Sequence, residues 1–356
     1  MSSDFGQKVR ISLFGESHGE CVGVVIDGLP ENILIDTDKI YTQLSRRAPG
    51  KDKTATPREE SDVPEIISGV LNNRTTGAPL CAVIKNSNTR SSDYEKFARY
   101  PRPSHADYTA MVRYNGANDL RGSGHFSARL TAPLVFAGAI CRDILEQKGI
   151  TIGGHICQIG NVFDDALDPV NVNAEQLKAL SSRYFSVINE NAEQAMRDAI
   201  EEVRLQGDSI GGTVEVAVCG VEPGIGSPIF DGIENEIAKA VFGIPAAKGI
   251  EFGKGFAFAS ERGSMANDPF AYNGERVVTT QNNNGGILGG ISTGMPIIFR
   301  TVFKPTASIA IKQNTVDLMT QKNSELTIEG RHDPCIAVRA LPVVESACAI
   351  ALINIV

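Results

Sequence analysis

The last fifteen residues of the chain, 342–356, are apolar on almost every face of the helix that they predict. Only Glu345, Ser346 and Asn354 interrupt this run, and Pro342 suits the first position of a helix, where a missing amide hydrogen costs nothing. A helix without a polar face must be covered by protein on all sides. The sequence therefore predicts that the C-terminal helix is buried, either in the core or at a contact between subunits.

The other predicted elements do not follow the strand–helix–strand rhythm of a parallel sheet. A long helix is predicted over 127–148, with an apolar stripe from Leu130 to Leu145 and Gly149 as its C-terminal stop. The remaining predictions are a helix that is capped at Asp36 or Thr37 and ends near Arg47, helices over 191–206 and 231–242, and strands over 9–14, 22–27, 80–84, 214–220 and 295–303. Because helices and strands do not alternate regularly, we expect the mixed α+β class.

The composition is typical of a soluble globular protein. The 356 residues are 42% hydrophobic and 21% charged, and no apolar run approaches the roughly 20 residues that a membrane-spanning helix needs. The N-terminus lacks the basic and apolar regions of a signal peptide. The seven cysteines are odd in number and contain no C-x-x-C pair, so free thiols are expected rather than disulfides or a metal site. We therefore expect a cytoplasmic protein with no membrane partner.

The net charge of −8 argues against a nucleic-acid partner, yet basic residues gather in two stretches of the chain. They are Arg46, Arg47, Lys51, Lys53 and Arg58, followed by Arg99, Arg102, Arg113, Arg121 and Arg129. Arginines in the glycine- and proline-rich loops of an acidic protein are typical of a site that neutralises a small polyanion. The alternative is a set of solvated surface charges.

Three short polar runs each place a histidine beside a carboxylate, although the chain has only five histidines. They are Gly15-Glu16-Ser17-His18-Gly19, Arg102-Pro103-Ser104-His105-Ala106-Asp107 and Gly330-Arg331-His332-Asp333-Pro334-Cys335. Imidazole titrates near neutral pH, and a nearby carboxylate sets its tautomer and its basicity. These runs are candidates for a proton-transfer site. By contrast, His155 is expected to be structural and His332 a framework residue beside Asp333.

Two glycine-rich segments are candidates for binding a phosphate or a flat ligand. The segment 121–127 precedes the long helix, whose free amide groups suit an anion, but no strand comes before it, so it is not a dinucleotide-binding fingerprint. A tight turn with Ser127 as the helix cap is the alternative. The segment 285–290 is either a loop against a ligand or a turn between strands, and the turn is the commoner outcome.

Taken together, these runs resemble those of the chorismate synthases, and the resemblance extends over nearly the whole chain. It also includes Asp27-Gly28-Leu29-Pro30, Ser45-Arg46-Arg47-Ala48-Pro49-Gly50, Gly207-Asp208-Ser209-Ile210-Gly211-Gly212 and Lys304-Pro305-Thr306. The resemblance implies a central layer of helices between antiparallel β-sheets, internally duplicated, in a single domain over 1–356 that assembles into a homotetramer. It also implies a carbon–oxygen lyase that converts 5-enolpyruvylshikimate 3-phosphate into chorismate and phosphate by a 1,4-elimination, a step of aromatic amino acid biosynthesis.

The resemblance further implies that reduced FMN is required but not consumed. By this resemblance, His18 protonates the leaving phosphate, His105 lies at N1 and the C2 carbonyl of the flavin, and Asp333 removes the proton from N5. The matching FMN contacts are His125, Phe126, Ser127, Pro245, Ala246, Gly289, Lys304, Pro305, Thr306, Ala307, Ser308 and Arg331. The matching substrate contacts are Ser17, Arg46, Arg47, Lys53, Arg129 and Arg339. Arg47 and Lys53 also match positions assigned to NADPH, although an external flavin reductant is expected because the sequence shows no added reductase domain.

The sequence departs from the common family pattern at or beside expected FMN contacts, namely at His125, Phe126, Leu130, Pro245 and Ala307. These departures concern the details of cofactor binding more than the reaction. Two other functions remain open, a phosphohydrolase with His18 as its nucleophile and a non-catalytic flavin-binding protein. Histidine phosphatases place an arginine directly before the histidine, where this chain has Ser17.

Overall fold

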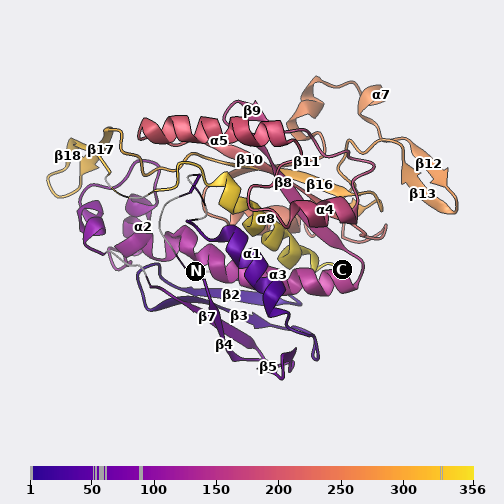
Figure 1. Cartoon of the computed structure of the whole chain (residues 1–356), viewed down its shortest axis with the longest axis horizontal. Coiled ribbons are helices and arrows are strands. Elements are labelled where there is room, and N and C mark those ends of the chain that lie inside the picture. The colour runs from indigo at the N-terminus through magenta and orange to yellow at the C-terminus, as the bar shows by residue number, and fades with distance from the viewer. Residues whose placement is uncertain are drawn as a thin grey trace.

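In the part of the chain that the structure describes, two five-stranded antiparallel sheets face each other across a layer of helices (Figure 1). The structure is a computed structural model and describes residues 3–50, 52, 54–55, 60, 62–87, 91–328, 330 and 332–356. The first sheet has the order β1 (Asp4–Phe5), β2 (Arg10–Gly15), β3 (Cys21–Asp27), β7 (Leu80–Lys85), β4 (Pro64–Ser68). The second has the order β11 (Ala247–Phe252), β16 (Ile297–Phe303), β10 (Gly212–Cys219), β8 (Thr151–Ile159), β9 (Val162–Phe163). This arrangement confirms the predicted fold class.

The helices between the sheets pack around α8. They are α1 (Thr37–Arg47), α3 (Thr131–Gln147), α6 (Ile233–Phe242) and α8 (Ala337–Leu352), and α8 contacts the other three. Every residue of α8 except Arg339 is buried, as its all-round apolar sequence predicts. The axes of α3 and α8 approach closely because Gly138 has no side chain, and a Cβ there would lie 2.2 Å from the Cβ of Ser346.

The predicted position of Pro342 at the start of the helix is wrong. The helix begins at Ala337, so Pro342 is its sixth residue and lies inside it. A proline there removes one backbone hydrogen bond of the helix. That lost bond is the one from residue 342 to the carbonyl of Val338, while the Pro342 carbonyl accepts a hydrogen bond from the Ser346 hydroxyl at 2.7 Å. The helix tolerates the proline because its faces are covered by the core.

The chain order of the elements repeats between the two halves. In the first half, β2, β3, α1, β4, β7 and α3 follow one another, and in the second half β8, β10, α6, β11, β16 and α8 do so. The matching strands also have the same order in their sheets, β2-β3-β7-β4 and β8-β10-β16-β11. This repetition confirms the internally duplicated topology.

The remaining elements of the described residues lie around this framework. They are β5 (Val70–Leu71), β6 (Arg74–Thr75), α2 (Asp107–Arg113), α4 (Ala174–Leu180), α5 (Glu190–Leu205), α7 (Gly263–Ala266), β12 (Phe270–Asn273), β13 (Arg276–Thr279), β14 (Ile287–Leu288), β15 (Ile291–Ser292), β17 (Gln313–Asp317), β18 (Lys322–Leu326) and 3-10 helices over Ser91–Ala98, Arg121–Phe126, Ala128–Leu130 and Gly255–Ser260. The predicted helices and strands are confirmed to within a few residues, including the cap at Asp36. Where the chain is described, no helix is both long and apolar enough to cross a bilayer.

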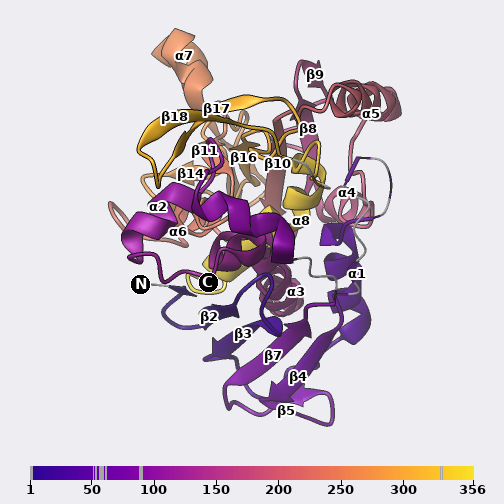
Figure 2. The ribbon, with the colours of Figure 1, turned by 90° about the vertical axis from the view of Figure 1, so that its left-hand side faces the viewer.

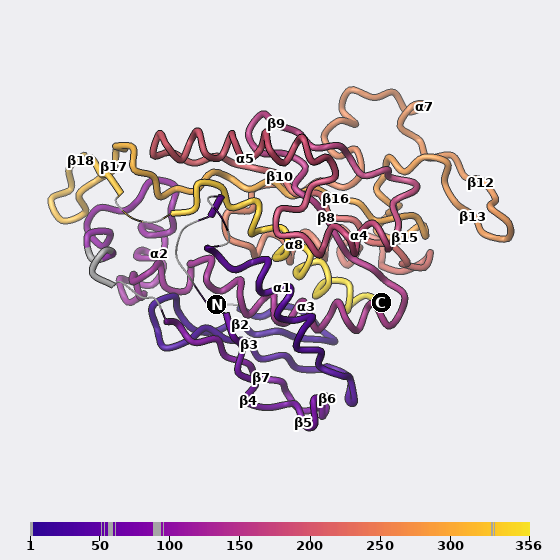
Figure 3. The backbone as a smooth tube through the Cα atoms, in the orientation of Figure 1, coloured from indigo at the N-terminus to yellow at the C-terminus, as the bar shows by residue number. Residues whose placement is uncertain are grey.

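The second histidine run, 102–107, and the chain that leads to the third, 330–335, lie at one end of the molecule. Figure 3 shows α2 and the β17–β18 hairpin at this end, whereas α7 and the β12–β13 hairpin project from the other, and Figure 2 looks onto the first end. The hairpin is joined to the segment before α2, because Arg99 pairs with Asp317 at 2.5 Å and Thr315 donates to the Pro101 carbonyl at 2.5 Å. The second run, 102–107, therefore lies against the chain that leads to the third.

Candidate active site

The loop that carries His18 is the tight connection between β2 and β3. The amide of Asn86 fixes this loop by donating to the carbonyls of Glu16 and Gly19, both at 2.9 Å. The His18 ring is 7% exposed and lies edge-on to Tyr94, with ring centroids 5.1 Å apart. It also lies against Gly122, where a Cβ would be 2.3 Å from the ring. Gly122 is therefore needed because it lets the 121–127 segment approach the histidine.

The second histidine is oriented by a buried arginine and a buried aspartate. Arg102 donates to Asp107 through its backbone amide, Nε and Nη2 at 3.0, 2.8 and 2.7 Å. His105 Nδ1 lies 2.8 Å from Asp107 Oδ1, which can only accept, and 3.1 Å from Arg102 Nη2, which can only donate. The shorter contact with the carboxylate favours a proton on Nδ1 that points to Asp107. Burial opposes ionisation of Asp107, but its bonds to Arg102 and His105 outweigh burial and hold its pKa well below its usual value.

Ser123 connects these two histidines. Its hydroxyl accepts from Arg102 Nη2 at 2.9 Å and lies 3.3 Å from His105 Nε2, and it follows Gly122 in the chain. The contacts run from His18 through Gly122 and Ser123 to His105. We call His18, Arg102, His105, Asp107 and Ser123 the histidine cluster.

The segment 304–308 leaves β16 and reaches the histidine cluster. Ser308 accepts from Arg102 Nη1 at 3.2 Å, and the Lys304 ammonium donates to the Ser104 carbonyl at 2.7 Å. The Thr306 hydroxyl is buried and has no hydrogen-bond partner. A buried hydroxyl without a partner is costly, so it is a natural contact for a bound ligand.

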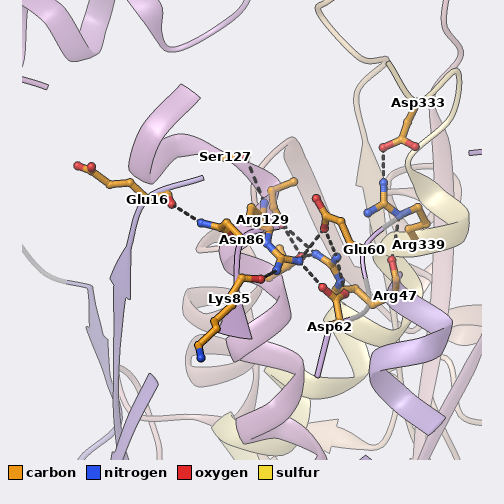
Figure 4. A network of polar contacts seen from close by, with 12 residues as sticks. Glu16, Arg47, Glu60, Asp62, Lys85, Asn86, Ser127, Arg129, Asp333 and Arg339 are labelled. Atoms are coloured by element: carbon orange, nitrogen blue, oxygen red, sulfur yellow. Dashed lines mark hydrogen bonds and ion pairs between the residues drawn. The ribbon is translucent and has the colours of Figure 1, made fainter. Parts of the chain in front are cut away.

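Three arginines from separate elements meet in one network of polar contacts (Figure 4). Arg47 ends α1, Arg129 lies in the 3-10 helix before α3, and Arg339 is the partly buried residue of α8. Their carboxylate partners are Glu60, Asp62 and Asp333. We call these six residues the arginine cluster.

Hydrogen bonds link the arginine cluster to the His18 loop. Arg129 Nε donates at 2.9 Å to Asn86, whose amide fixes that loop, and Arg339 Nε donates at 2.9 Å to the Arg47 carbonyl. Arg339 also pairs with Asp333. The substrate contacts predicted at Arg47, Arg129 and Arg339 are therefore brought together, and Ser17 lies beside Gly122 at the adjacent loop.

His332 and Asp333 join the two clusters. Burial and the nearby charge of Arg102 lower the pKa of His332 to about 4, so its imidazole is neutral at physiological pH. Its Nε2 is buried without a hydrogen-bond partner. The next residue, Asp333, pairs with Arg339. The third histidine run thus places a neutral imidazole and a carboxylate at the boundary between the clusters.

A cavity of about 1170 Å³ is lined by four of the predicted FMN contacts, His125, Phe126, Ser127 and Pro245. Phe126 is partly exposed, and its ring meets Tyr114 at a centroid distance of 6.0 Å. Both nitrogens of His125 have protein partners, since Nδ1 lies 3.0 Å from the Gly15 carbonyl and Nε2 lies 2.8 Å from the Ser3 hydroxyl. The Ser127 hydroxyl accepts from the Arg129 amide at 3.3 Å. Ser127 is therefore a helix cap, as in the alternative interpretation of segment 121–127 as a tight turn.

Other predicted contacts lie apart from the clusters. Arg46 is buried against Glu345, with Nη1 2.5 Å from its carboxylate, and Glu345 also pairs with Arg142 at 2.8 Å. Gly289 lies in the turn between β14 and β15, with φ of +61°. Segment 285–290 therefore includes a turn between strands, the commoner of the two outcomes expected for it. Ala246 has φ of +68°, and its carbonyl accepts from the Lys304 amide at 3.1 Å.

Two predicted contacts, Lys53 and Arg331, fall outside the described residues. Pro305 and Ala307 are part of the segment 304–308. Leu130, one of the departures from the family pattern, is buried and lines the 1170 Å³ cavity together with Leu134.

Several site residues were not singled out from the sequence. The signal for Arg102 and Asp107 was present, because both belong to the second histidine run. No pattern pointed to Asn86, Glu60 or Asp62, since their partners lie far away in the chain.

Comparison with known proteins identifies related chains over nearly the full length. The family model described as chorismate synthase matches residues 9–356. A chorismate synthase of Thermococcus kodakarensis is 46% identical over 344 residues, 97% of this chain and 94% of the relative. One of Dehalococcoides mccartyi is 45% identical over 355 residues, 100% of this chain and 96% of the relative. A crystal structure of a chorismate synthase superposes with a TM-score of 0.77 at 29% identity, over 98% of this chain and 92% of that one.

Proposed function

The chain belongs to the chorismate synthase family and is a carbon–oxygen lyase that forms chorismate from 5-enolpyruvylshikimate 3-phosphate, and we propose that the reaction takes place where its two polar clusters meet. The observation that carries this proposal is that Asn86 connects the two clusters, because its amide donates to the His18 loop and its oxygen accepts from Arg129. Proton-transfer groups and anion-binding groups are thus adjacent, as an elimination of phosphate requires.

The arginine cluster is the proposed binding site for the acidic groups of the substrate. Guanidinium groups pair with phosphates and carboxylates through two parallel hydrogen bonds. Arg47 and Arg129 share the carboxylates of Glu60 and Asp62, and Arg339 joins them through the hydrogen bond from its Nε to the Arg47 carbonyl. Arg46 is not included, because Glu345 already occupies its guanidinium. Ser17 and Lys53 remain predicted contacts.

His18 is the proposed acid that protonates the leaving phosphate. Its loop is fixed by Asn86, which also contacts Arg129, so the imidazole is positioned relative to the anion site. A phosphate that leaves with a proton is a better leaving group than the trianion, and an imidazole is well matched to supply this proton near neutral pH. Neither the phosphohydrolase nor the non-catalytic alternative is favoured by any observation of this site.

The family requires a reduced flavin, and we propose that it is FMN and that it binds beside segment 304–308. The buried, unpartnered Thr306 hydroxyl and His332 Nε2 fit such a ligand, because each would gain a hydrogen bond. Lys304 and Ser308 would bind its polar groups, and Phe126, Ser127 and Pro245 would contact it from the cavity. When bound, the reduced flavin supplies an electron-rich ring and is recovered unchanged.

The chain's own residues then control protons around this site. His105 keeps one proton on Nδ1, directed to Asp107, and presents Nε2 to Ser123. Asp333 pairs with Arg339, and we propose that its carboxylate accepts a proton during turnover. The homotetramer, the single domain over 1–356, the cytoplasmic location, and NADPH or an external reductant as the electron source stay predictions.

An anaerobic assay with dithionite-reduced FMN tests this function. Incubation with 5-enolpyruvylshikimate 3-phosphate should release chorismate and phosphate in equal amounts. Release of phosphate without chorismate would instead identify a phosphohydrolase. Flavin binding without release of either product would identify a non-catalytic flavoprotein.

A further inference from the structure

The arginine cluster carries no net charge among the residues that the structure describes. Three guanidiniums, of Arg47, Arg129 and Arg339, are balanced by three carboxylates. Attraction of an anion by the arginines is then offset by repulsion from the carboxylates. Among these six residues, a phosphate or carboxylate of the substrate competes with the protein carboxylates that already bind the guanidiniums.

Asp62 has the contacts of a carboxylate that stays bound to Arg47 and Arg129 when a ligand binds. Its two oxygens bind different arginines, Oδ2 to Arg47 at 2.7 Å and Oδ1 to Arg129. Its side chain is 1% exposed. Burial opposes its ionisation, but the charges of Arg47 and Arg129 outweigh burial and lower its pKa. Removing Asp62 would leave two buried guanidiniums to share the single carboxylate of Glu60, which is destabilising.

Glu60 contacts the same arginines in a different way. A single oxygen, Oε2, lies 2.6 Å from Arg129 Nη1 and 3.3 Å from Arg47 Nη2. Its side chain is 8% exposed, more than that of Asp62, and it is longer by one methylene. One oxygen placed between two guanidiniums is also the contact that a phosphate or carboxylate of a ligand would make.

Arg47 has hydrogen-bonding capacity that its protein partners leave unused. Its side chain is 2% exposed, yet its Nε is buried with no hydrogen-bond partner. A buried guanidinium donor without a partner costs free energy. An anion that replaced Glu60 could bind Nε and Nη2 together, whereas Glu60 contacts only Nη2.

We propose that Glu60 occupies the place of an anionic group of the substrate on Arg129 and Arg47, and that the substrate displaces it on binding. This inference rests on the proposed function, because it takes the arginine cluster as the substrate site. Glu60 is then a competing residue and not a catalytic one. It keeps two buried arginines compensated in the free enzyme and lowers the affinity for every anion that binds there.

Calorimetric titration of the variant Glu60→Gln tests this role. Glutamine keeps the shape of glutamate but removes the competing charge, so we expect affinity to increase about tenfold. Two probes distinguish the groups: inorganic phosphate carries only a phosphate, and shikimate carries only a carboxylate. The probe that gains affinity identifies the group that Glu60 replaces. Glu60→Asp, which keeps the charge on a shorter side chain, should give an intermediate gain.

Glu65→Gln is the matched control, because it removes an exposed carboxylate that is 58% accessible and pairs with Lys85 at 3.4 Å. It should bind both probes like the wild type. Unchanged or weaker binding of both probes by Glu60→Gln, with a normal thermal unfolding curve, would overturn the proposal. If Glu60→Gln does not fold, a Glu60→Asp variant with wild-type or weaker affinity for both probes would overturn it as well.

Arg129→Met separates this failure from failure of the proposed function. If the arginine cluster binds substrate, this variant should lose affinity for the probes whatever the role of Glu60. If it binds both probes like the wild type, the substrate site lies elsewhere, and the location proposed for the reaction fails instead.

Discussion

Each histidine run places its imidazole in a different electrostatic surrounding. His105 is tied to a carboxylate through Asp107, whereas burial and Arg102 lower the pKa of His332 to about 4. His18 lies against the edge of Tyr94 on a loop fixed by a neutral amide. These differences are physical reasons for assigning the residues different roles, since Asp107 orients the His105 ring whereas burial and Arg102 keep His332 neutral.

Replacing His18 with alanine tests its assignment as the acid. Turnover should fall roughly 100-fold to 10,000-fold, the usual range for loss of a general acid, while FMN still binds. Stopped-flow measurement of chorismate formation and a separate flavin titration give the two quantities. Turnover close to that of the wild type would remove His18 from the mechanism.

At this scale the sequence predicted residues whose partners are near in the chain. The Arg102–Asp107 and His105–Asp107 contacts fall within one run. It could not predict that Arg46 pairs with Glu345, because these residues are 299 positions apart and meet only after α1 and α8 pack. Arg46 and Arg47 are adjacent arginines in the sequence, but Arg46 binds Glu345 of α8 whereas Arg47 belongs to the arginine cluster.

Buried charge also connects whole elements. Glu345 of α8 binds Arg46 of α1 and Arg142 of α3, so one carboxylate joins the three helices that lie behind the arginine cluster. In the second sheet, His155 of β8 lies between Asp164, at 2.7 Å, and Glu215 of β10, at 3.0 Å. Both contacts are buried, and the helix and strand patterns alone contain no signal for either.

The His155 contacts predict a pH dependence of stability. Burial alone would lower the pKa of His155, but hydrogen bonds and charge from Asp164 and Glu215 outweigh it, so the pKa is raised above 6.5. The protonated ring therefore contributes stability that is complete below about pH 6.5 and is lost as the pH rises through the raised value.

Urea unfolding of the wild type and of His155→Gln at pH 6 and pH 9 measures this contribution. Glutamine cannot titrate, so the stability advantage of the wild type should be larger at pH 6 than at pH 9. An advantage that does not change between the two values would show that His155 is not a charged partner of the two carboxylates.

The duplication organises the molecule as a whole. Arg129 precedes α3, and Arg339 lies on α8, the matching helix of the second half. The duplication was expected only from the resemblance, because a repeated topology needs only the same order of hydrophobic elements and not the same residues. The fold class followed from the element pattern, whereas the layered sandwich was expected only from the resemblance.

Assembly is also a property of the whole molecule. The apolar C-terminal helix is buried in the core of its own chain, so its composition is not evidence for a subunit contact. The homotetramer stays a prediction that the family resemblance implies. Light scattering at micromolar concentration should give about four times the chain mass of 38.1 kDa. A stable monomer of 38.1 kDa would contradict this prediction.

The most direct test of a reaction centred between the two clusters is the turnover of Asp333→Asn. Asp333 pairs with Arg339 in one cluster and follows His332 toward the other. Asparagine has nearly the same shape but is a far weaker proton acceptor, so chorismate formation should slow by about 100-fold or more. FMN affinity and thermal stability should stay close to those of the wild type, and the isotope effect with substrate deuterated at C6 should change. Wild-type turnover, or slow turnover with an unchanged isotope effect, would contradict the account.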